Sequence, residues 1–454
     1  MEPKQVVTSF LQHEEKILIL KRSEKVGTHQ GRWAGISGYL EKREEPLKRA
    51  LTEIKEEVDL SADQVELIRV GEPIGIPDAE NGVFWVVHPH LFKAGSVELK
   101  TDWEHTEHRW IEPDELVKYH TVPALNETLQ KVLPTPLEKI IPNPEVLGQI
   151  RDIESDRTHG ASFLAAEAVQ TLVKAFEAED ESVDFDLFLA RFKMLAERLM
   201  GLRPSMAPFN NLVGELLAKT VKRAETTRSI GELKTFVGDE ANRVIEAAEE
   251  ERRVIAKKAA ETISQYVPEN GKILIHSYSS TVLDALKQAY EKGRGFEVIV
   301  TESRPLFEGR TTAKELADYG MPVMLVTDAA SPYFATGVDM VLLGADSLFA
   351  DGSVVNKAGT YSIVLAAAYH GAPVYVLAGL SKVNLRSFFS HVLLEEKDTR
   401  EVWENAPENI TVRNLYFDLT PKFFINGIIT EIQTLRPDEL LRVCQEIVKE
   451  RYII

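Results

Sequence analysis

From about residue 272 to the end of the chain, short apolar runs alternate with longer segments of helical spacing. Each apolar run ends in polar or small residues. The runs and their tails lie at residues 273–280, 296–305, 322–331, 338–361 and 373–382. This alternation predicts a parallel, doubly wound sheet. Ligands of such sheets bind outside the carboxyl ends of the strands, so we expect the polar tails to form a site.

The longest tail is GADSLFADGSVVNKAGTY, Gly344 to Tyr361. It follows the apolar run VDMVLL, which reads as a buried strand. Asp346 therefore comes just past the carboxyl end of that strand, where an acid is a candidate site residue.

The first 132 residues follow a different pattern. Residues 5–21 alternate between apolar and polar positions and are interrupted at His13 to Lys16, which predicts a hairpin. Further strands are expected within residues 66–95, and RWIEPDEL at 109–116 predicts a strand that runs into a helix.

A helix is predicted in the later part of residues 38–60, because apolar residues recur on one face. They are Leu47, Leu51, Ile54 and Val58. On another side, Glu53, Glu56 and Glu57 share one surface at spacings of three and four residues. Magnesium prefers carboxylate oxygens, so these acids suit metal-assisted cleavage of a diphosphate. The alternative is an ordinary solvated helix face.

The best candidate linker is the stretch at residues 133–146, which contains four prolines. From about 147 to 265 the pattern is helical, interrupted only at 201–211. We therefore predict a first domain at 1–132, the linker, a helical subdomain at 147–265 and a parallel α/β domain at 266–454.

Composition narrows the class of protein. The formal charge of −18, from 53 basic and 71 acidic residues, argues against nonspecific binding to nucleic acid or to an anionic membrane. A single cysteine, Cys444, allows no internal disulfide. The start of the chain lacks a signal-peptide pattern, and no apolar run approaches the roughly 18 residues of a membrane helix. We expect a cytoplasmic protein.

The region around the acidic helix resembles the Nudix box, a loop–helix–loop that binds the metal of a diphosphate hydrolase. The resemblance rests on Gly38, Glu44 and the three helix glutamates, and it covers roughly residues 1–132, including GRW and EHTEHRW. It implies an α/β/α sandwich and Mg²⁺ or Mn²⁺ as cofactor. The metal would be held by Glu53, Glu56 and Glu57, which we also predict to be catalytic.

Two positions depart from the Nudix pattern. Thr52 stands where the family has arginine, and Asp59 where it has glycine. Arg49 precedes Glu53 by four residues and is our predicted substitute for the arginine. Asp59 tolerates a left-handed backbone better than most residues.

Three further residues of this region have open roles. A base from a late loop would be Glu104 or Glu107, unless these are only surface acids. Trp33 either stacks on a base or sugar or packs in the core.

The second half, about residues 150–454, resembles the family that unites the alpha, beta and delta subunits of translation initiation factor 2B with two sugar-phosphate isomerases. One isomerase acts on methylthioribose 1-phosphate and the other on ribose 1,5-bisphosphate. The resemblance implies a Rossmann-like domain and a homodimer or higher homo-oligomer. The matching motifs are GLRP (Gly201–Pro204), TESRPLFEGRTTAKEL (Thr301–Leu316), GADSLFADGSVVNKAGT (Gly344–Thr360) and FDLTPKFFINGIITE (Phe417–Glu431).

The side chains of these motifs suit a sugar phosphate. Guanidinium groups are suited to phosphate, and the amino end of a helix favours an anion. Asp346 is the predicted proton shuttle between sugar carbons C1 and C2. The predicted substrate-binding residues are Arg203, Arg304, Arg310, Ser279, Asn356 and Lys357. The alternatives are loop capping for Asn356 and Lys357, and a salt bridge for Arg304.

One departure from the isomerases concerns their catalytic cysteine. The loop after the first strand reads Ile-His-Ser-Tyr-Ser-Ser, so Ser277 stands in its place. A thiol exchanges protons near neutral pH, whereas a serine hydroxyl needs a strong neighbouring base. Cys444 lies far along the chain and is no replacement, and the loop is more similar to the initiation-factor subunits.

Three hypotheses about function follow. The first is a Nudix hydrolase of phosphoribosyl diphosphate or ADP-ribose fused to a ribose-1,5-bisphosphate-isomerase-like enzyme, with Ser277 and Asp346 as catalytic residues. The second is a Nudix hydrolase whose second half only binds a sugar phosphate or nucleotide and regulates. The third is an initiation-factor-like scaffold. In the first two, the partner is a small phosphorylated metabolite.

Overall fold

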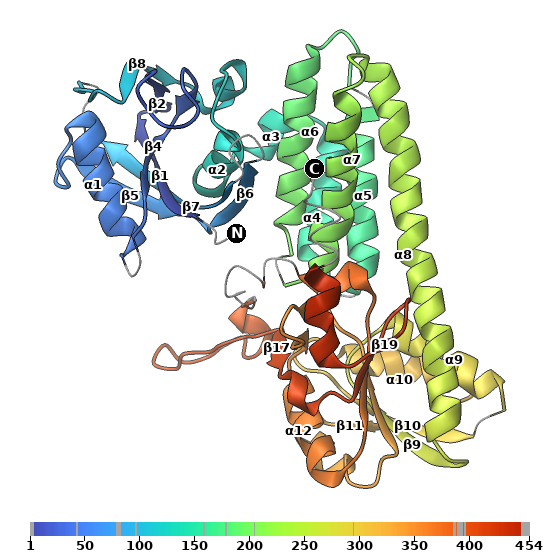
Figure 1. Cartoon of the computed structure of the whole chain (residues 1–454). Helices are drawn as coiled ribbons and strands as arrows, with labels where there is room; N and C mark the ends of the chain where they lie inside the picture. Colours follow the sequence, from blue (N-terminus) through green and yellow to red (C-terminus); the bar gives the residue numbers. More distant parts are fainter. Residues whose placement is uncertain are drawn as a thin grey trace. The chain divides into compact units, whose positions relative to one another are not determined.

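The computed structural model describes residues 4–41, 44–78, 83–95, 98–157, 159–177, 179–203, 205–293, 295–384, 387, 394 and 396–445. The chain divides into two compact units (Figure 1). One unit holds Met1–Asn143 with Ser182–Leu195, and the other Pro144–Glu181 with Ala196–Ile453. The acidic helix belongs to the first unit and all five predicted strands to the second.

The first unit is built on a mixed, eight-stranded sheet. Its strands are β1 (Lys4–His13), β2 (Lys16–Arg22), β3 (Trp33–Ala34), β4 (Ile36–Tyr39), β5 (Val65–Val70), β6 (Ile74–Asp78), β7 (Val83–Ala94) and β8 (His105–Ile111). β1 is parallel to β7 and antiparallel to β2 and β4. The predicted hairpin is confirmed, because β1 and β2 pair at Gln12 and Ile17.

Helices cover both faces of this sheet. In β2, Leu18 and Leu20 pack in the core beside α1 (Pro46–Val58), whereas Ile17 and Ile19 pack in the core beside α2 (Leu125–Val132). Burying each such side chain contributes about 1.5–3 kcal/mol, and the period of two in β2 places alternate residues in opposite cores. The predicted α/β/α sandwich is confirmed.

The predicted helical region contains several helices. They are α4 (Pro144–Ser155), α5 (Ala161–Glu177), α6 (Phe185–Met200), α7 (Gly214–Ala224) and α8 (Ile230–Tyr266), preceded in the predicted linker by α3 (Leu137–Ile140). The chain also leaves the helical conformation at 225–229, so the region has more breaks than predicted. Within the proline-rich stretch, α3 forms and Ile140 and Ile141 are buried. The domain boundaries placed there stay a prediction.

The second unit contains a seven-stranded sheet in the order β11-β10-β9-β12-β15-β18-β19. These strands are β9 (Gly271–Ile275), β10 (Phe296–Thr301), β11 (Val323–Val326), β12 (Met340–Leu343), β15 (Val374–Leu377), β18 (Gly427–Ile429) and β19 (Thr434–Leu435). All neighbours are parallel except β18 and β19. The strand order reverses between β9 and β12, which defines a topological switch point at which ligands of such sheets bind.

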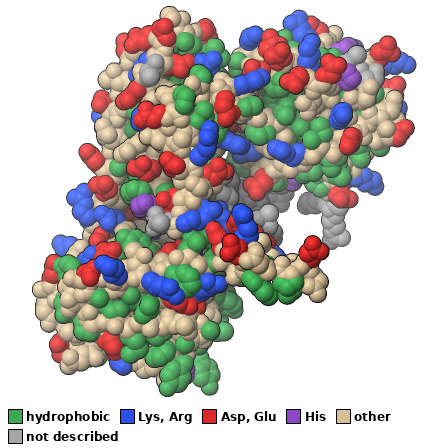
Figure 2. Space-filling view, turned by 180° about the vertical axis from the view of Figure 1, so that it is seen from behind, with side chains coloured by type: hydrophobic (Ala, Val, Ile, Leu, Met, Phe, Trp, Pro, Cys, Tyr) green, Lys and Arg blue, Asp and Glu red, His purple; other side chains and the backbone are tan. Residues whose placement is uncertain are grey.

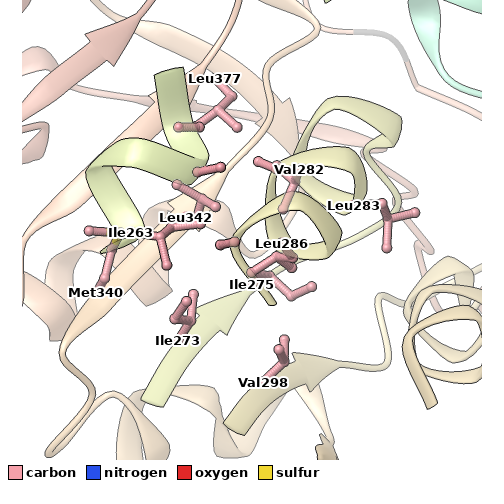
Figure 3. Close-up of a cluster of buried hydrophobic side chains, with 14 of the residues drawn as sticks. Ile263, Ile273, Ile275, Val282, Leu283, Leu286, Val298, Met340, Leu342 and Leu377 are labelled. Carbon is pink, nitrogen blue, oxygen red and sulfur yellow. The ribbon is translucent and has the colours of Figure 1, made fainter. Parts of the chain in front are cut away.

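Both faces of this sheet are also covered, as a doubly wound fold requires. On one face, Ile273 and Ile275 of β9 pack with Leu286 of α9 (Ser280–Glu291) and Ile263 of α8 (Figure 3). On the other face, alternate strand residues pack against α12 (Thr360–His370). The predicted Rossmann-like architecture is confirmed.

A small sheet follows β12 and carries part of the long polar tail. Its order is β16-β13-β14-β17, formed by Val383–Asn384, Ser347–Phe349, Val354–Lys357 and Phe417–Thr420. Asp346 thus lies in the connection from β12 to β13.

The surface of the molecule carries acidic and basic side chains interspersed on the face seen in Figure 2. Among the described helices, none is both long and apolar enough to cross a membrane.

Candidate functional site

The acidic helix α1 begins and ends as its sequence directs. Pro46 occupies the first turn, where its missing N–H costs nothing. At the carboxyl end, Asp59 adopts a left-handed backbone, φ 59° and ψ 28°. The residue that replaces the family glycine therefore takes the conformation that glycine usually provides. Lys55 donates to Asp59 Oδ1 at 2.5 Å and stabilises this turn.

Arg49 forms an ion pair with Glu53, as the sequence predicted for a substitute arginine. Glu53 is buried at 5% exposure, and burial raises its pKa although Arg49 opposes this. The Arg49 guanidinium is also 3.9 Å from the exposed Glu56 carboxylate. Gly38 allows this arrangement, because a Cβ there would lie 1.5 Å from Glu53 Oε1. The Glu53 carboxylate therefore fits against β4 only because residue 38 has no side chain.

Glu57 is held from the other side of the same site. Its Oε1 accepts from the Ser37 backbone N–H at 3.0 Å, and its Oε2 lies 3.5 Å from His105 Nε2. His105 Nδ1 is 3.1 Å from Asp102 Oδ1. Burial raises the pKa of Glu57 well above its ordinary value. The sequence reasoning missed His105 and Asp102, although His105 lies within the EHTEHRW motif.

Of the two candidate bases, Glu104 is the one whose charge acts on the helix acids. Burial is the main cause that raises the pKa of Glu53, Glu57 and Glu104; the charge of Glu104 adds to the first two, and those of Asp102 and Glu56 add to that of Glu104. Glu107 instead pairs with Arg109, whose Nη2 is 2.6 Å away. We call Glu53, Glu56, Glu57 and Glu104 the acidic site.

The acidic site fits a divalent cation on its donor chemistry. Glu57 Oε2 is buried and has no hydrogen-bond partner, and burial, with a smaller contribution from the charges of Glu53 and Glu104, raises the pKa of Glu57. A bound cation would give Glu57 Oε2 a partner and would favour the ionised form of the carboxylate. The carboxylates do not form a closed ligand set: among the described residues, no three acidic, histidine or cysteine side chains lie together as metal ligands.

Trp33 packs in the core. It is 7% exposed, its ring meets Tyr119 edge-on at 5.3 Å, and the Arg109 guanidinium lies 5.2 Å from the ring. Of the two roles left open by the sequence, core packing is the one that this placement supports.

In the second unit, Ser277 and Asp346 follow the two strands that flank the switch point, β9 and β12. The two loops touch, since a Cβ at Gly344 would lie 2.7 Å from Ser279 Oγ. Ser279 itself is the amino-terminal cap of α9, accepting from Val282 N. We call the loops after β9, β10, β12 and β14 the strand-end site.

Ser277 has a left-handed backbone, with φ 66°. Its N–H donates to Ser303 Oγ at 2.9 Å, and its carbonyl accepts from Thr312 Oγ1 at 3.0 Å. Ser303 is also left-handed, at φ 61°. Such conformations cluster at functional sites, and here they mark the loops of β9 and β10.

The neighbouring His276 cannot act as a base toward Ser277. Its Nε2 lies 3.0 Å from the carbonyl oxygen of Ala358, which only accepts, so Nε2 carries the proton. Its Nδ1 therefore accepts from Thr301 Oγ1 at 2.5 Å. Complete burial lowers the pKa of His276, so the ring is neutral and both nitrogens are engaged.

Asp346 is half-buried, and its backbone joins two segments. Its N–H donates to the Val355 carbonyl at 2.9 Å, and its carbonyl accepts from Ala207 N at 3.2 Å. Lys382 is buried beside it and donates to the Ala345 carbonyl at 2.7 Å. Burial lowers the pKa of Lys382, opposed by the charges of Asp346 and Glu251. Sequence reasoning missed this lysine, which lies in the tail after β15.

The arginines of the second motif flank one aromatic ring. Arg304 lies 5.0 Å and Arg310 3.8 Å from the centre of Phe307. Arg310 also pairs with Glu302 at 3.0 Å, whereas the backbone N–H of Arg304 donates to Asp328. The Arg310 guanidinium is thus paired with Glu302, and that of Arg304 lies near the same ring; a role of either in phosphate binding stays a prediction.

Arg203 is buried at 2% exposure. Its Nη2 donates to the carbonyls of Ile153 at 2.9 Å and Asp156 at 2.6 Å. These contacts join the end of α4 to the segment after α6, which is a structural role. Substrate binding by Arg203 stays a prediction, and Pro204 of the same motif lies outside the described residues.

Asn356 and Lys357 are both buried in β14. The Asn356 amide donates to Thr360 Oγ1 at 3.0 Å, which is a capping contact. Lys357 Nζ pairs with Glu308 at 2.8 Å and lies 4.3 Å from the centre of the Tyr416 ring. Lys357 thus has a buried counter-ion, and substrate binding by either residue stays a prediction.

Asp418, within the FDLTP motif, is a further acid that the sequence reasoning did not single out. Its Oδ2 accepts from the backbone N–H groups of Gly359 at 2.8 Å and Tyr361 at 3.1 Å, at the start of α12. Burial outweighs these hydrogen bonds and raises the pKa of Asp418 to about 6.

The fold and sites define a two-part α/β protein, with buried helix carboxylates in one part and loops at a topological switch point in the other. Comparison with known families agrees. The NUDIX domain matches residues 3–134, and the initiation factor 2 subunit family matches residues 157–437. The chain belongs to the initiation factor 2 subunit family and carries a Nudix domain at its amino end.

Relatives of the second part include both enzymes and translation factors. The ribose 1,5-bisphosphate isomerase of Archaeoglobus fulgidus is 35% identical over 303 residues, 65% of this chain and 90% of the isomerase. The methylthioribose-1-phosphate isomerase of Syntrophotalea carbinolica is 32% identical, over 66% and 92% of the two chains. The crystal structure of translation initiation factor eIF-2B from Pyrococcus horikoshii OT3 matches with a TM-score of 0.54 and 32% identity, over 65% and 98%. The chain is thus a Nudix domain fused to an isomerase-like domain.

Proposed function

We propose that this protein is a magnesium- or manganese-dependent hydrolase of a small phosphorylated metabolite that contains a diphosphate, either phosphoribosyl diphosphate or ADP-ribose. The observation that supports the proposal is the burial of Glu53 and Glu57 on one side of α1, with the charges of Glu53 and Glu104 acting on Glu57, whose Oε2 has no hydrogen-bond partner. A solvated helix face, the alternative reading of the sequence, does not bury Glu53 and Glu57.

Each residue of the acidic site has a role in the proposed hydrolysis. Glu53, Glu56 and Glu57 hold the cation, which when bound neutralises phosphate oxygens and lowers the pKa of water. Arg49 orients Glu53 through their ion pair. Glu104, whose pKa is raised by burial, accepts the proton of the attacking water.

For the second part, we propose an aldose–ketose isomerase of the ribose 1,5-bisphosphate class. The placement of Asp346 at the switch point supports it, with Asp346 moving a proton between C1 and C2 of the sugar. With phosphoribosyl diphosphate as the Nudix substrate, hydrolysis would yield ribose 1,5-bisphosphate, and the fusion would join consecutive steps.

A specific observation favours the second candidate function, a binding or regulatory domain without turnover. Ser277 replaces the cysteine of the isomerases, and His276 has no free nitrogen to activate it. The crystallised relative is named as a translation initiation factor, which keeps the scaffold hypothesis open as well. A homodimer or higher assembly and a cytoplasmic location remain part of the proposal.

A proton and phosphorus NMR time course with ribose 1,5-bisphosphate tests the second part. Ribulose 1,5-bisphosphate formed by the full chain and abolished by Asp346→Asn supports the isomerase. The absence of product from the wild type, with or without product from Ser277→Cys, supports the binding domain. The same spectra with ADP-ribose and phosphoribosyl diphosphate test the hydrolase, and Glu53→Gln is the matched inactive variant.

A further inference from the structure

The strand β5 lies at an edge of the sheet of the first unit and carries exposed apolar side chains. Among the described residues it pairs with β7 alone, so its other side is open. Leu67, Ile68 and Val70 are 39%, 48% and 55% exposed. An open edge presents backbone N–H and C=O groups that can pair with another strand. We call residues Val65–Val70 the β5 edge.

The β5 edge has the same order of residue types when it is followed from either end. Its sequence, VELIRV, runs apolar, charged, apolar, apolar, charged, apolar. The two charged residues, Glu66 and Arg69, have opposite signs and are both exposed. An antiparallel copy can therefore be aligned so that Glu66 of each chain is opposite Arg69 of the other. Opposite charges that face each other across two strands stabilise the pairing, whereas like charges destabilise it.

An irregularity in β5 places the two charges on one face of the sheet. Residues three apart in a regular strand lie on opposite faces. In the β5 edge the register with β7 shifts between Leu67 and Arg69, so that one residue of β5 is extra. Glu66 pairs with Lys93 of β7. Arg69 pairs with Leu91, which lies two positions away in β7 and therefore on the same face.

The valines at the two ends of the β5 edge lie on the other face. Val65 pairs with Ala94, the neighbour of Lys93, and Val70 pairs with a residue four positions before Ala94. Both valines therefore share the face opposite that of the charges. In the symmetric alignment, Val65 of one chain is opposite Val70 of the other. Apolar residues then meet apolar residues, and each acid meets a base.

We infer that the β5 edge pairs with the β5 edge of a second copy of this chain, antiparallel and about a two-fold axis, with Glu66 opposite Arg69 of the other chain. A charge on an exposed edge usually prevents pairing with a foreign strand. Here the charges also select the alignment, because bringing Glu66 or Arg69 opposite itself would oppose like charges. This interface depends on neither of the proposed enzymatic activities.

The contact is small, since each chain contributes a strand of 6 residues. Interfaces that bury less than about 1,000 Å² are weak or transient. Covalent trapping in the full chain is therefore the suitable measurement.

The first test uses the double variant Glu66→Cys/Arg69→Cys. In the inferred pairing, the Cα atoms of these residues in the two chains are about 4.5–5.5 Å apart, within the range of disulfides. Within one chain they are about 10 Å apart along the strand, which is too far. The native Cys444 is 0% exposed and does not compete. We expect oxidation to give disulfide-linked dimers in which mass spectrometry finds residue 66 joined to residue 69.

The single variants Glu66→Cys and Arg69→Cys are the matched controls, because in the inferred alignment each residue is about 10 Å from its own copy. Glu15→Cys, an exposed thiol in the turn between β1 and β2, measures random collision. The inference is overturned if the double variant forms dimers no faster than Glu15→Cys. Single variants that form dimers as fast as the double variant would overturn it as well.

The second test changes the charges and monitors the pairing with Val65→Cys/Val70→Cys, a pair that is also opposite. Adding Glu66→Arg replaces two attractive pairs by two repulsive ones and should slow disulfide formation on the order of tenfold. Adding Arg69→Glu as well exchanges the two charges and should restore the rate. Glu15→Arg makes the same change of charge elsewhere in the first unit and should leave the rate unchanged. An unchanged rate with Glu66→Arg, or no recovery with the exchanged charges, would contradict the inferred pairing.

Discussion

Gly38→Ala should inactivate the acidic site while leaving the backbone of β4 intact. A Cβ at residue 38 would lie 1.5 Å from Glu53 Oε1, 2.0 Å from its Cδ and 2.6 Å from its Cγ. Non-bonded carbon contacts need more than 3 Å, so the whole carboxylate must swing away from Arg49. Gly38 does not have a positive φ, and alanine strains nothing in the main chain.

The effects of Gly38→Ala on stability and on hydrolysis can both be estimated from the structure. Overpacking of this kind costs about 1–3 kcal/mol of stability. Loss of an oriented metal-binding group reduces activity or metal affinity by roughly 10- to 100-fold, even when only its supporting partner is removed. We therefore expect a modest fall in Tm and a loss of Mg²⁺-dependent hydrolysis of at least that size.

The assay compares hydrolysis rates over a Mg²⁺ titration and thermal unfolding followed by circular dichroism. Gly27→Ala is the matched control, because a Cβ there would meet nothing within 4 Å. Wild-type rates in Gly38→Ala with an unchanged Mg²⁺ requirement would refute the assignment of Glu53 to the metal. If Gly38→Ala does not fold, the same Mg²⁺ titration is made with Glu53→Gln, which removes the charge of Glu53 without adding volume.

Three more predictions follow from named contacts. Arg49→Ala should raise the Mg²⁺ concentration needed for half-maximal hydrolysis by roughly 10- to 100-fold, because Glu53 loses its partner; an unchanged titration would contradict this. Asp418 has a folded pKa of about 6, above its unfolded value of 3.8, so its contribution to stability is full below pH 4 and is lost as pH rises to about 6. Asp418→Asn should remove that loss, worth up to about 3 kcal/mol, in Tm measured across pH 4–7. Lys382→Met should destabilise the second unit by about 3–5 kcal/mol in urea unfolding, whereas an unchanged midpoint would mean that the buried amine is neutral.

Local pattern predicted the elements well, because period and spacing are properties of neighbouring residues. The hairpin at 5–21, the acidic helix and the strands before the polar tails all form. The ion pair of Arg49 with Glu53 was also predictable, since residues four apart on a helix are neighbours on its surface. Asp59 was expected to tolerate a left-handed backbone, and its backbone does have that conformation.

Contacts between distant segments could not be predicted in the same way. The choice between Glu104 and Glu107 depends on which face of β8 and its preceding loop meets α1, and periodicity in so short a segment does not settle it. The burial of Arg203 depends on two carbonyl oxygens about 50 residues away. Lys382 lies beside Asp346 only because β12 and β15 are neighbours in the sheet. Such residues carry no local sequence signal.

The loop that holds Ser277 makes the cysteine replacement a clean test of the isomerase. Its left-handed backbone costs roughly 1–3 kcal/mol, and the contacts that maintain it are a backbone N–H to Ser303 and a backbone carbonyl from Thr312. Neither contact involves the side chain of residue 277. We therefore expect Ser277→Cys to keep the wild-type Tm and the wild-type affinity for ribose 1,5-bisphosphate in calorimetry.

Because the scaffold is unchanged, turnover in Ser277→Cys then reports on the thiol alone. Product formed only by Ser277→Cys would show that the strand-end site has the geometry of an isomerase and lacks its proton-exchanging group. Binding without turnover in both proteins would mean that the missing thiol is not the cause of inactivity, which would then lie in the buried Lys357–Glu308 pair or in the orientation of Asp346. A fall in Tm would refute the argument that the loop is held through its backbone.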